Sequence, residues 1–202
     1  MLLLAACELE SGGDADGADS TMAAGDQPHV MAANDTVAGR YLVVIGGCND
    51  CHTPGFMQDP NSVPEAQWLT GLPIGFRGPW GTSYPRNLRL TAQQWDEETW
   101  VQTLRTRHTL PPMPWHSVNN MSEHDTRAIY RYIRSLGPAG QAAPLPAPPG
   151  QEPTTPYFDF VPQHMERMPG GPPPGSPAAP GPATPAPTTP SPTPPADTAR
   201  TL

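Results

Sequence analysis

The sequence contains no lysine and only three cysteines among its 202 residues. Its cationic side chains are therefore arginines, 11 of them against 19 acidic residues, which gives a formal net charge of −8. The acidic excess is confined to the ends, because residues 35–136 contain nine arginines and nine acidic residues. The chain lacks the clustered basic residues that are typical of nucleic-acid-binding proteins. We expect no nucleic-acid partner, and cationic docking of a protein partner would use arginine.

Proline is abundant, with 31 residues, and most of them follow residue 136. The changes in composition near residues 34 and 137 predict one folded domain, residues 35–138, of a usual domain size. Residues 8–34 are rich in Gly, Ala, Asp and Ser without apolar periodicity, which predicts a flexible acidic tether. Residues 139–202 predict a Pro-rich, largely disordered tail. Only its aromatic stretch, residues 157–160, is expected to pack back on the domain.

Residues 48–52 read Cys-Asn-Asp-Cys-His, the C-x-x-C-H spacing at which haem c is attached. In such a motif the thiols, here Cys48 and Cys51, form thioethers with the haem vinyl groups. The imidazole, here His52, becomes the proximal iron ligand. The alternatives are a disulfide, a zinc site or a thioredoxin-like redox pair. Zinc needs further ligands at a sensible spacing, and a redox pair needs a βαβ context. Neither is evident, so we expect one covalent haem.

A second signal is the stretch Leu-Pro-Pro-Met-Pro-Trp at residues 110–115. Its prolines predict a stiff loop that would hold the weak thioether ligand of Met113 in place. Taken alone, the simpler interpretation is an ordinary methionine in a proline-rich turn. Downstream of a haem motif we favour Met113 as the distal iron ligand. Met121 is the runner-up because it also precedes the last helix, whereas Met57 is too close to His52 to cross the haem easily.

The hydrophobic pattern predicts an all-α fold. A first helix is expected to begin at Asp35 or Thr36 and to present one buried apolar stripe made of Val37, Tyr41, Val44 and Cys48. The aromatic-rich loop at residues 53–89 would wrap a flat ligand, although a small aromatic core without a cofactor is the plain alternative.

Residues 91–107 contain a second expected helix, capped by Asp96 and buried through Trp100, Val101 and Leu104. Residues 122–136 form the last one, which begins with Ser122 and, three residues on, Asp125 in a capping-box-like arrangement. Its buried stripe is expected to be Ile129, Ile133 and Leu136, with Tyr132 beside it. Its arginines Arg127, Arg131 and Arg134 are interpreted as a solvated face rather than a docking patch.

The first seven residues, Met-Leu-Leu-Leu-Ala-Ala-Cys, resemble a partial lipobox, in which the cysteine is lipidated. The stretch lacks the positive n-region and the 7–15 apolar residues of a signal peptide, and a start upstream of Met1 would account for both. A buried or accidental Cys7 is the alternative. Haem attachment to C-x-x-C-H in bacteria takes place outside the cytoplasm. We therefore expect the bacterial periplasm or cell envelope, with a lipid on Cys7 as membrane anchor.

Taken together, residues 36–138 resemble the class I cytochrome c domains, and most closely those of the cytochrome subunits of membrane-bound alcohol and gluconate dehydrogenases. The segments that carry the resemblance are residues 39–42, 46–53, 84–88, 111–114 and 128–136. It implies a cytochrome c fold of three to four helices around one haem, with His52 and Met113 as axial ligands. It also implies haem contacts near the propionates by Trp80, Asn87 and Arg77. Those dehydrogenase subunits carry several haem domains, whereas this chain has one C-x-x-C-H.

His/Met ligation closes both axial positions of the iron, and no general acid, nucleophile or second metal site is evident. The sequence therefore predicts a single-haem electron carrier rather than an enzyme, although it could serve as the electron-accepting subunit of a dehydrogenase complex. Its partners would be redox proteins, a dehydrogenase as donor and a terminal oxidase as acceptor. The alternative is a haem-based sensor of small ligands, or a minor redox enzyme, with a displaceable sixth ligand.

Overall fold

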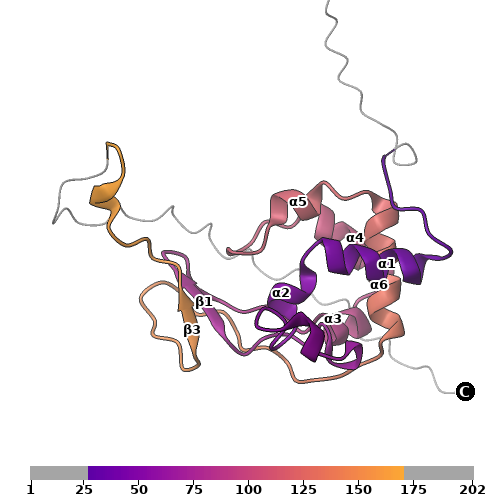
Figure 1. The fold of residues 1–202 in the computed structure, drawn as a ribbon, viewed down its shortest axis with the longest axis horizontal. Helices are drawn as coiled ribbons and strands as arrows, with labels where there is room; N and C mark the ends of the chain where they lie inside the picture. Colours follow the sequence, from indigo (N-terminus) through magenta and orange to yellow (C-terminus); the bar gives the residue numbers. More distant parts are fainter. Residues whose placement is uncertain (1–26, 171–202) are drawn as a thin grey trace, which may run out of the picture.

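The computed structural model describes residues 27–170 (Figure 1). Cys7, the first part of the expected tether and the end of the expected tail lie outside the described residues. Helices and strands follow the order α1 Asp35–Ile45, α2 Cys48–His52, β1 Gly75–Gly78, β2 Gly81–Ser83, α3 Leu88–Gln94, α4 Glu97–Thr106, α5 Trp115–Asn119, α6 Glu123–Ser135 and β3 Tyr157–Asp159. Short 3-10 turns occupy Pro60–Ser62, Glu65–Gln67 and Met165–Arg167. None of the described helices combines the length and apolarity that a membrane crossing requires.

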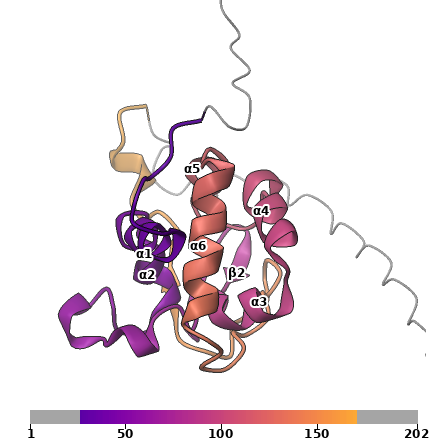
Figure 2. The same cartoon turned by 90° about the vertical axis from the view of Figure 1, so that its right-hand side faces the viewer.

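Helix α6 lies between α1 on one side and α4 on the other (Figure 2). Its contact with α1 depends on a glycine. A Cβ on Gly39 would come within 2.0 Å of the carbonyl oxygen of Ala128 and 2.8 Å of the Cβ of Tyr132. Only a residue without a side chain allows the two helices to approach this closely.

The cap of α1 is Asn34, whose Oδ1 accepts a hydrogen bond from Val37 N at 3.0 Å, and not Asp35 or Thr36 as expected. The buried face of α1 is not the one expected from the sequence either. Val37, Tyr41 and Val44 are 51%, 52% and 44% exposed, and α1 instead buries Ala38, Gly39, Leu42 and Val43. The apolar pattern fits two neighbouring stripes of the helix equally well. The tertiary contact selects the stripe with the smaller residues, because it lets α1 pack closely on α6.

The second and last predicted helices are confirmed. The Asp96 carboxylate accepts a hydrogen bond from Thr99 N at 2.7 Å at the start of α4. The Ser122 hydroxyl accepts one from Asp125 N at 3.1 Å at the start of α6. Most residues of the expected stripes are buried, namely Trp100 and Val101 from α4, and Ile129, Tyr132 and Ile133 from α6. Leu104 and Leu136 are only half-buried.

The capping box, however, is only half formed. The Asp125 carboxylate accepts a hydrogen bond from Val30 N at 2.9 Å instead of turning back to the cap residue. The ring of His29 lies 4.4 Å from that of His124. The last residues of the segment expected to be a free tether therefore pack against the start of α6.

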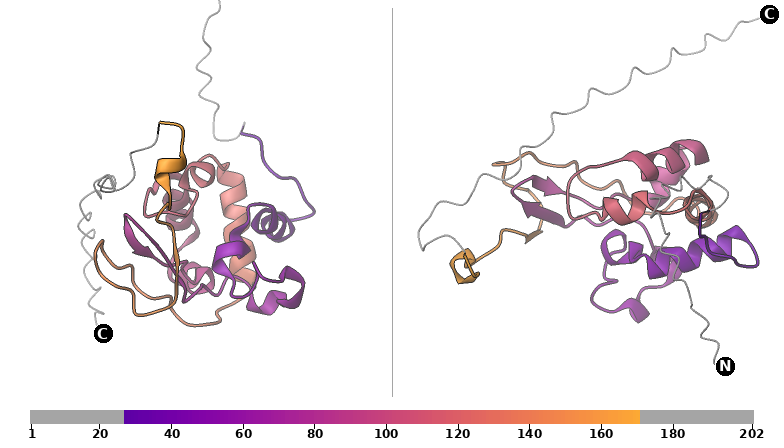
Figure 3. Two further views of the ribbon diagram at one scale, coloured as in Figure 1. Left: turned by 60° about the vertical axis from the view of Figure 1, so that its left-hand side comes forward. Right: turned by 90° about the horizontal axis from the view of Figure 1, so that it is seen from above.

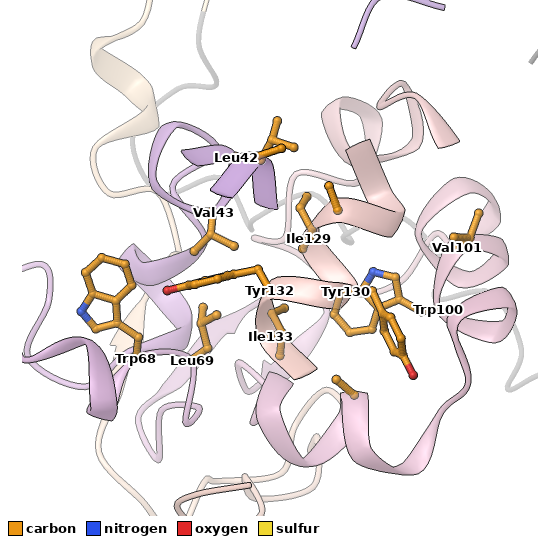
Figure 4. Packing of buried hydrophobic residues seen from close by; sticks show 13 residues of the cluster. Leu42, Val43, Trp68, Leu69, Trp100, Val101, Ile129, Tyr130, Tyr132 and Ile133 are labelled. Atoms are coloured by element: carbon orange, nitrogen blue, oxygen red, sulfur yellow. The ribbon is translucent and has the colours of Figure 1, made fainter. Parts of the chain in front are cut away.

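The core gathers residues of the three long helices and the loop before β1 (Figure 4). Tyr132 extends from α6 toward Trp68, and its hydroxyl donates to Glu65 Oε1 at 2.8 Å. The ring of Tyr130, also on α6, lies 5.9 Å from the ring of Trp100 on α4. Arg127 forms ion pairs with acidic side chains of α4 and α6. Arg131 forms ion pairs with acidic side chains of α4 and α1. These two arginines join the helices, so this face carries interhelical ion pairs that the interpretation as a solvated face did not include.

A buried arginine fixes the end of α6. Arg89 donates to the carbonyl oxygens of Gly137 and Ala66, each at 2.6 Å, and to that of Leu136. Its partners are all backbone acceptors, and burial lowers the pKa of the guanidinium. Arg89 thereby holds α3, the loop before β1 and the end of α6 together.

The expected all-α fold did not include the three-stranded sheet, which has the order β2-β1-β3 and lies to one side of the helices (Figure 3). β1 and β2 form an antiparallel hairpin, and β3 adds to β1 in parallel, with Phe76 opposite Phe158. The rings of these two residues are 5.5 Å apart, and Phe160 lies 5.6 Å from Phe76. The return of the aromatic stretch to the domain is confirmed.

The packed part of the chain consequently extends beyond residue 138, where the tail was expected to begin. Ala147 exchanges backbone hydrogen bonds with Thr82 at 2.8 and 2.9 Å. The hydroxyls of Tyr84 and Thr155 are 2.8 Å apart. The unpaired edge of the hairpin and its aromatic face need partners, and residues 139–160 provide them.

Candidate haem site

Helix α2 carries the whole C-x-x-C-H motif on little more than one turn. Gly47 precedes it with φ of 64°, in the left-handed region that glycine adopts without strain. A Cβ on Gly46 would lie 2.8 Å from the carbonyl oxygen of Leu42. These two glycines let the chain turn sharply from α1 into α2. The position of Cys48 is thus set by this turn and not by the apolar stripe of α1.

The imidazole of His52 is buried and oriented by the backbone. Its Nδ1 lies 2.7 Å from the carbonyl oxygen of Arg86. Because a carbonyl can only accept, Nδ1 carries the proton and Nε2 has a free lone pair. Burial lowers the pKa of His52, and the hydrogen bond to Arg86 opposes this only in part. A neutral imidazole with its other nitrogen hydrogen-bonded is the form in which histidine ligates metals.

Asn49, within the motif, is the most deeply buried residue of α2, at 1% exposure. The Thr53 hydroxyl donates to Asn49 Oδ1 at 2.6 Å and accepts from Leu69 N at 2.8 Å. Gly71 N donates to the carbonyl oxygen of His52 at 2.8 Å. These contacts attach α2 to the loop before β1. The spacing of the motif gave no signal for Asn49, because any residue type can stand between the cysteines.

Cys48 and Cys51 are free thiols. Burial, together with the nearby Asp50 carboxylate, raises the pKa of Cys48 to about 11 and also raises that of Cys51. A thioredoxin-like pair has the opposite property, a lowered pKa at the attacking thiol, and α2 follows a helix instead of a strand. Within residues 27–170 no three His, Cys, Asp or Glu side chains gather closely enough to hold a metal ion. The zinc and redox-pair alternatives therefore find no support in this geometry.

Met113 lies half-buried in the loop between α4 and α5. Ser83 of β2 donates to the carbonyl oxygen of Pro111, and Trp115 N donates to that of Met113 at 2.8 Å. Hydrogen bonds thus hold the loop on both sides of the methionine. Met121 packs against the hydrophobic core near Gly46, and Met57 is exposed. Met113 as distal ligand stays a prediction.

The three haem contacts implied by the resemblance have partners within the protein. Arg77 pairs with Glu152 at 2.8 Å and stacks over the ring of Tyr157. Trp80 donates to the carbonyl oxygen of Phe76 at 3.3 Å.

Asn87 caps α3 through Leu90 N at 3.0 Å and donates to the carbonyl oxygens of Ala139 and Gln141. A residue that the sequence did not single out, Arg86, supplies the acceptor for His52. No side-chain pattern signals a backbone acceptor.

The chain is similar to two characterised proteins over about half of its length. It is 32% identical over 111 residues to the cytochrome subunit of fructose dehydrogenase from Gluconobacter japonicus, which covers 51% of this chain and 22% of that protein. It is 27% identical over 116 residues to a subunit of nicotinate dehydrogenase from Pseudomonas putida, which covers 52% of this chain and 9% of that protein. The chain thus spans less than a quarter of the length of either relative. No family model and no solved structure matches it. The similarity to dehydrogenase subunits, one of them a cytochrome, agrees with the resemblance seen in the motifs.

Proposed function

We propose that this chain is a single-haem c-type cytochrome that carries one electron at a time between redox proteins outside the cytoplasm. Cys48 and Cys51 would bind the haem covalently, and His52 and Met113 would ligate its iron. The observation that carries the proposal is the hydrogen bond from His52 Nδ1 to Arg86, which leaves Nε2 free directly after two free thiols on one short helix. When bound, the haem supplies a one-electron iron couple, whose potential His/Met ligation raises.

The protein's own residues suit the task of holding such a group rigidly. Asn49 and Thr53 fasten α2 to the loop before β1, and the Arg86 carbonyl fixes the ring plane of His52. Ser83 fastens the loop that contains Met113, the residue that would supply the second ligand. Ligands that are fixed before and after electron transfer need little rearrangement. If His52 and Met113 both ligate the iron, they would leave no position for a substrate, which favours a carrier over an enzyme.

The similarity to dehydrogenase subunits supports a dehydrogenase as electron donor. A terminal oxidase as acceptor, the periplasm as compartment and a lipid anchor on Cys7 belong to the same proposal. They rest on the haem motif and the lipobox. A cytochrome c fold is likewise proposed, and the close packing of α1 against α6 beside the haem motif supports it.

The test is expression of the full chain in a host with haem c maturation. We expect covalent haem by intact mass and a low-spin spectrum with the weak near-infrared-edge band of methionine-ligated ferric haem. Met113→Ala should remove that band and lower the potential, and Met121→Ala is the matched control. If Met121→Ala removes the band and Met113→Ala keeps it, the ligand assignment is wrong. If a variant with both Cys48→Ser and Cys51→Ser still has the added mass of covalent haem and the same spectrum, the cytochrome proposal fails.

One observation favours the second candidate, a sensor with a displaceable ligand. Pro111, Pro112 and Pro114, which surround Met113, are all exposed, so the loop lies at the surface. A sensor would bind carbon monoxide or nitric oxide at micromolar concentrations, with displacement of the methionine. The carrier should resist carbon monoxide in the ferrous state, so a titration of the reduced protein separates the two.

A further inference from the structure

Two arginines beside the candidate haem site, Arg86 and Arg107, have no acidic partner among residues 27–170. Among the described residues, six arginines form ion pairs with Asp or Glu of the protein: Arg40, Arg77, Arg105, Arg127, Arg131 and Arg167. Arg89 and Arg134 donate to backbone carbonyls. The side chains of Arg86 and Arg107 make neither kind of contact within residues 27–170.

Each of these two arginines belongs to a segment that contacts or carries a proposed iron ligand. The carbonyl oxygen of Arg86 accepts the hydrogen bond from His52. Arg107 ends α4, and its guanidinium lies 5.8 Å from the ring centre of Trp115, whose backbone N–H donates to the carbonyl of Met113. One cation is thus attached to the segment of each proposed iron ligand. Burial lowers the pKa of Arg107, and the positive charge of Arg86 lowers it further.

A third unsatisfied donor lies with them. The indole Nε1 of Trp115 is buried and has no acceptor among the described residues. Buried N–H groups in native proteins nearly always have an acceptor. The guanidinium of Arg107 lies over the ring that carries this donor, and Arg86 lies in the segment that orients His52. They share one requirement, an anion with several acceptor oxygens.

We propose that Arg86, Arg107 and Trp115 bind the haem propionates, an inference that rests on the proposed function. A carboxylate fits both the planar donor fork of arginine and the single indole N–H. The residues implied by the resemblance are less suited. Arg77 is already paired with Glu152, Asn87 has backbone partners for its whole amide group, and Trp80 donates to Phe76. The three donors assigned here have no other partner in the described structure.

The proposal predicts a specific effect on the reduction potential. A fixed cation beside the haem disfavours the ferric state, which carries one more positive charge. Its removal should lower the potential, and a tenfold change in the preference between oxidation states corresponds to about 59 mV for one electron. A residue that only supports the fold would change stability without this directed shift.

The experiment measures the midpoint potential at pH 7 of the full chain with haem attached. Arg86→Gln and Arg107→Gln should each lower the potential. The expected decrease corresponds to a change of about threefold to tenfold in the equilibrium between the ferric and ferrous states. Arg107→Lys should restore most of the loss, because it keeps the charge. Trp115→Phe, which keeps the ring and removes the N–H, should give a smaller decrease. Arg77→Gln removes an equal charge from a paired guanidinium and should change the potential least.

An unchanged potential in both Arg86→Gln and Arg107→Gln would overturn the proposal, and so would a larger decrease in Arg77→Gln. An unchanged potential with slower, salt-dependent electron exchange with an acidic partner would overturn it in favour of a docking role. If Arg107→Gln does not fold, Arg86→Gln carries the test, because that side chain is exposed. Wild-type protein without covalent haem would contradict the proposed function itself. If the haem is attached but the potential does not change in these variants, only the propionate assignment is contradicted.

Discussion

His52 Nδ1 and the carbonyl oxygen of Arg86 lie 2.7 Å apart across 34 residues of sequence. The orientation of the histidine in the motif therefore depends on a loop in the middle of the chain. This loop is held on both sides of Arg86. Leu72 N donates to the carbonyl oxygen of Pro85 at 3.2 Å, and the amide group of Asn87 is buried among backbone partners. Asn87 therefore fixes the position of the histidine's partner without touching the histidine.

Asn87→Ala should lower the free energy of unfolding by about 2–3 kcal/mol. The loss of a helix cap costs about 1 kcal/mol, and the unsatisfied carbonyls of Ala139 and Gln141 add to it. Chemical denaturation monitored by circular dichroism measures this value. Asn120→Ala is the matched control, since the exposed Asn120 makes one local hydrogen bond, to His116. A changed haem potential at full stability would instead favour the haem-contact role that the resemblance implies for Asn87.

Gly39→Ala should be among the most destabilising small substitutions in α1. The added methyl group would overlap the Ala128 carbonyl, 2.0 Å away, and α1 would have to move off α6. The expected loss in the free energy of unfolding is roughly 1–3 kcal/mol. Val37→Ala, on the exposed stripe, should change it by less than about 0.5 kcal/mol. If Val37→Ala cost more than Gly39→Ala, the stripe expected from the sequence would be the buried one.

The contrast between these two positions shows which features the sequence predicts. The caps Asp96 and Ser122 were predicted correctly because a cap bonds to a backbone N–H three residues away, within one helical turn. The haem motif is local in the same way. The buried face of α1 depends on which partner helix approaches, and the acceptor of His52 is a backbone atom of a distant loop. Neither leaves a local pattern in the sequence, and the same holds for the pairing of β3 with β1.

Acidification should destabilise the contact between α4 and α6. Hydrogen bonds from Arg131, and then from Arg127, lower the pKa of Glu97 below its ordinary value of 4.5. A carboxyl group whose pKa is lower in the folded state stabilises the protein above its unfolded pKa. This contribution is lost as the pH falls through the folded pKa. The free energy of unfolding should therefore decrease below about pH 5, as measured by denaturation at several pH values.

Glu97→Gln tests the source of this effect. It should lower stability at pH 7 by about 1 kcal/mol or less, as expected for a partly exposed ion pair, and should flatten the decrease toward acid pH. Glu98→Gln is the matched control, because that carboxylate is more exposed and contacts Arg127 alone. An equal flattening in Glu98→Gln would show that the general charge of this surface, not the contacts of Glu97, sets the pH dependence.

Truncation should test whether residues 139–161 stabilise the domain. A chain ending at Val161 keeps β3, the bridge between Thr82 and Ala147 and the contact between Tyr84 and Thr155. We expect its unfolding temperature to stay within about 3 °C of the full chain. A chain ending at Gly137 loses these contacts and also the acceptors of Asn87. Its unfolding temperature should fall by more than about 5 °C, since 1 kcal/mol corresponds to 4–8 °C in a domain of this size. Equal unfolding temperatures in the two truncated chains would mean that residues 139–160 lie against the hairpin without stabilising it.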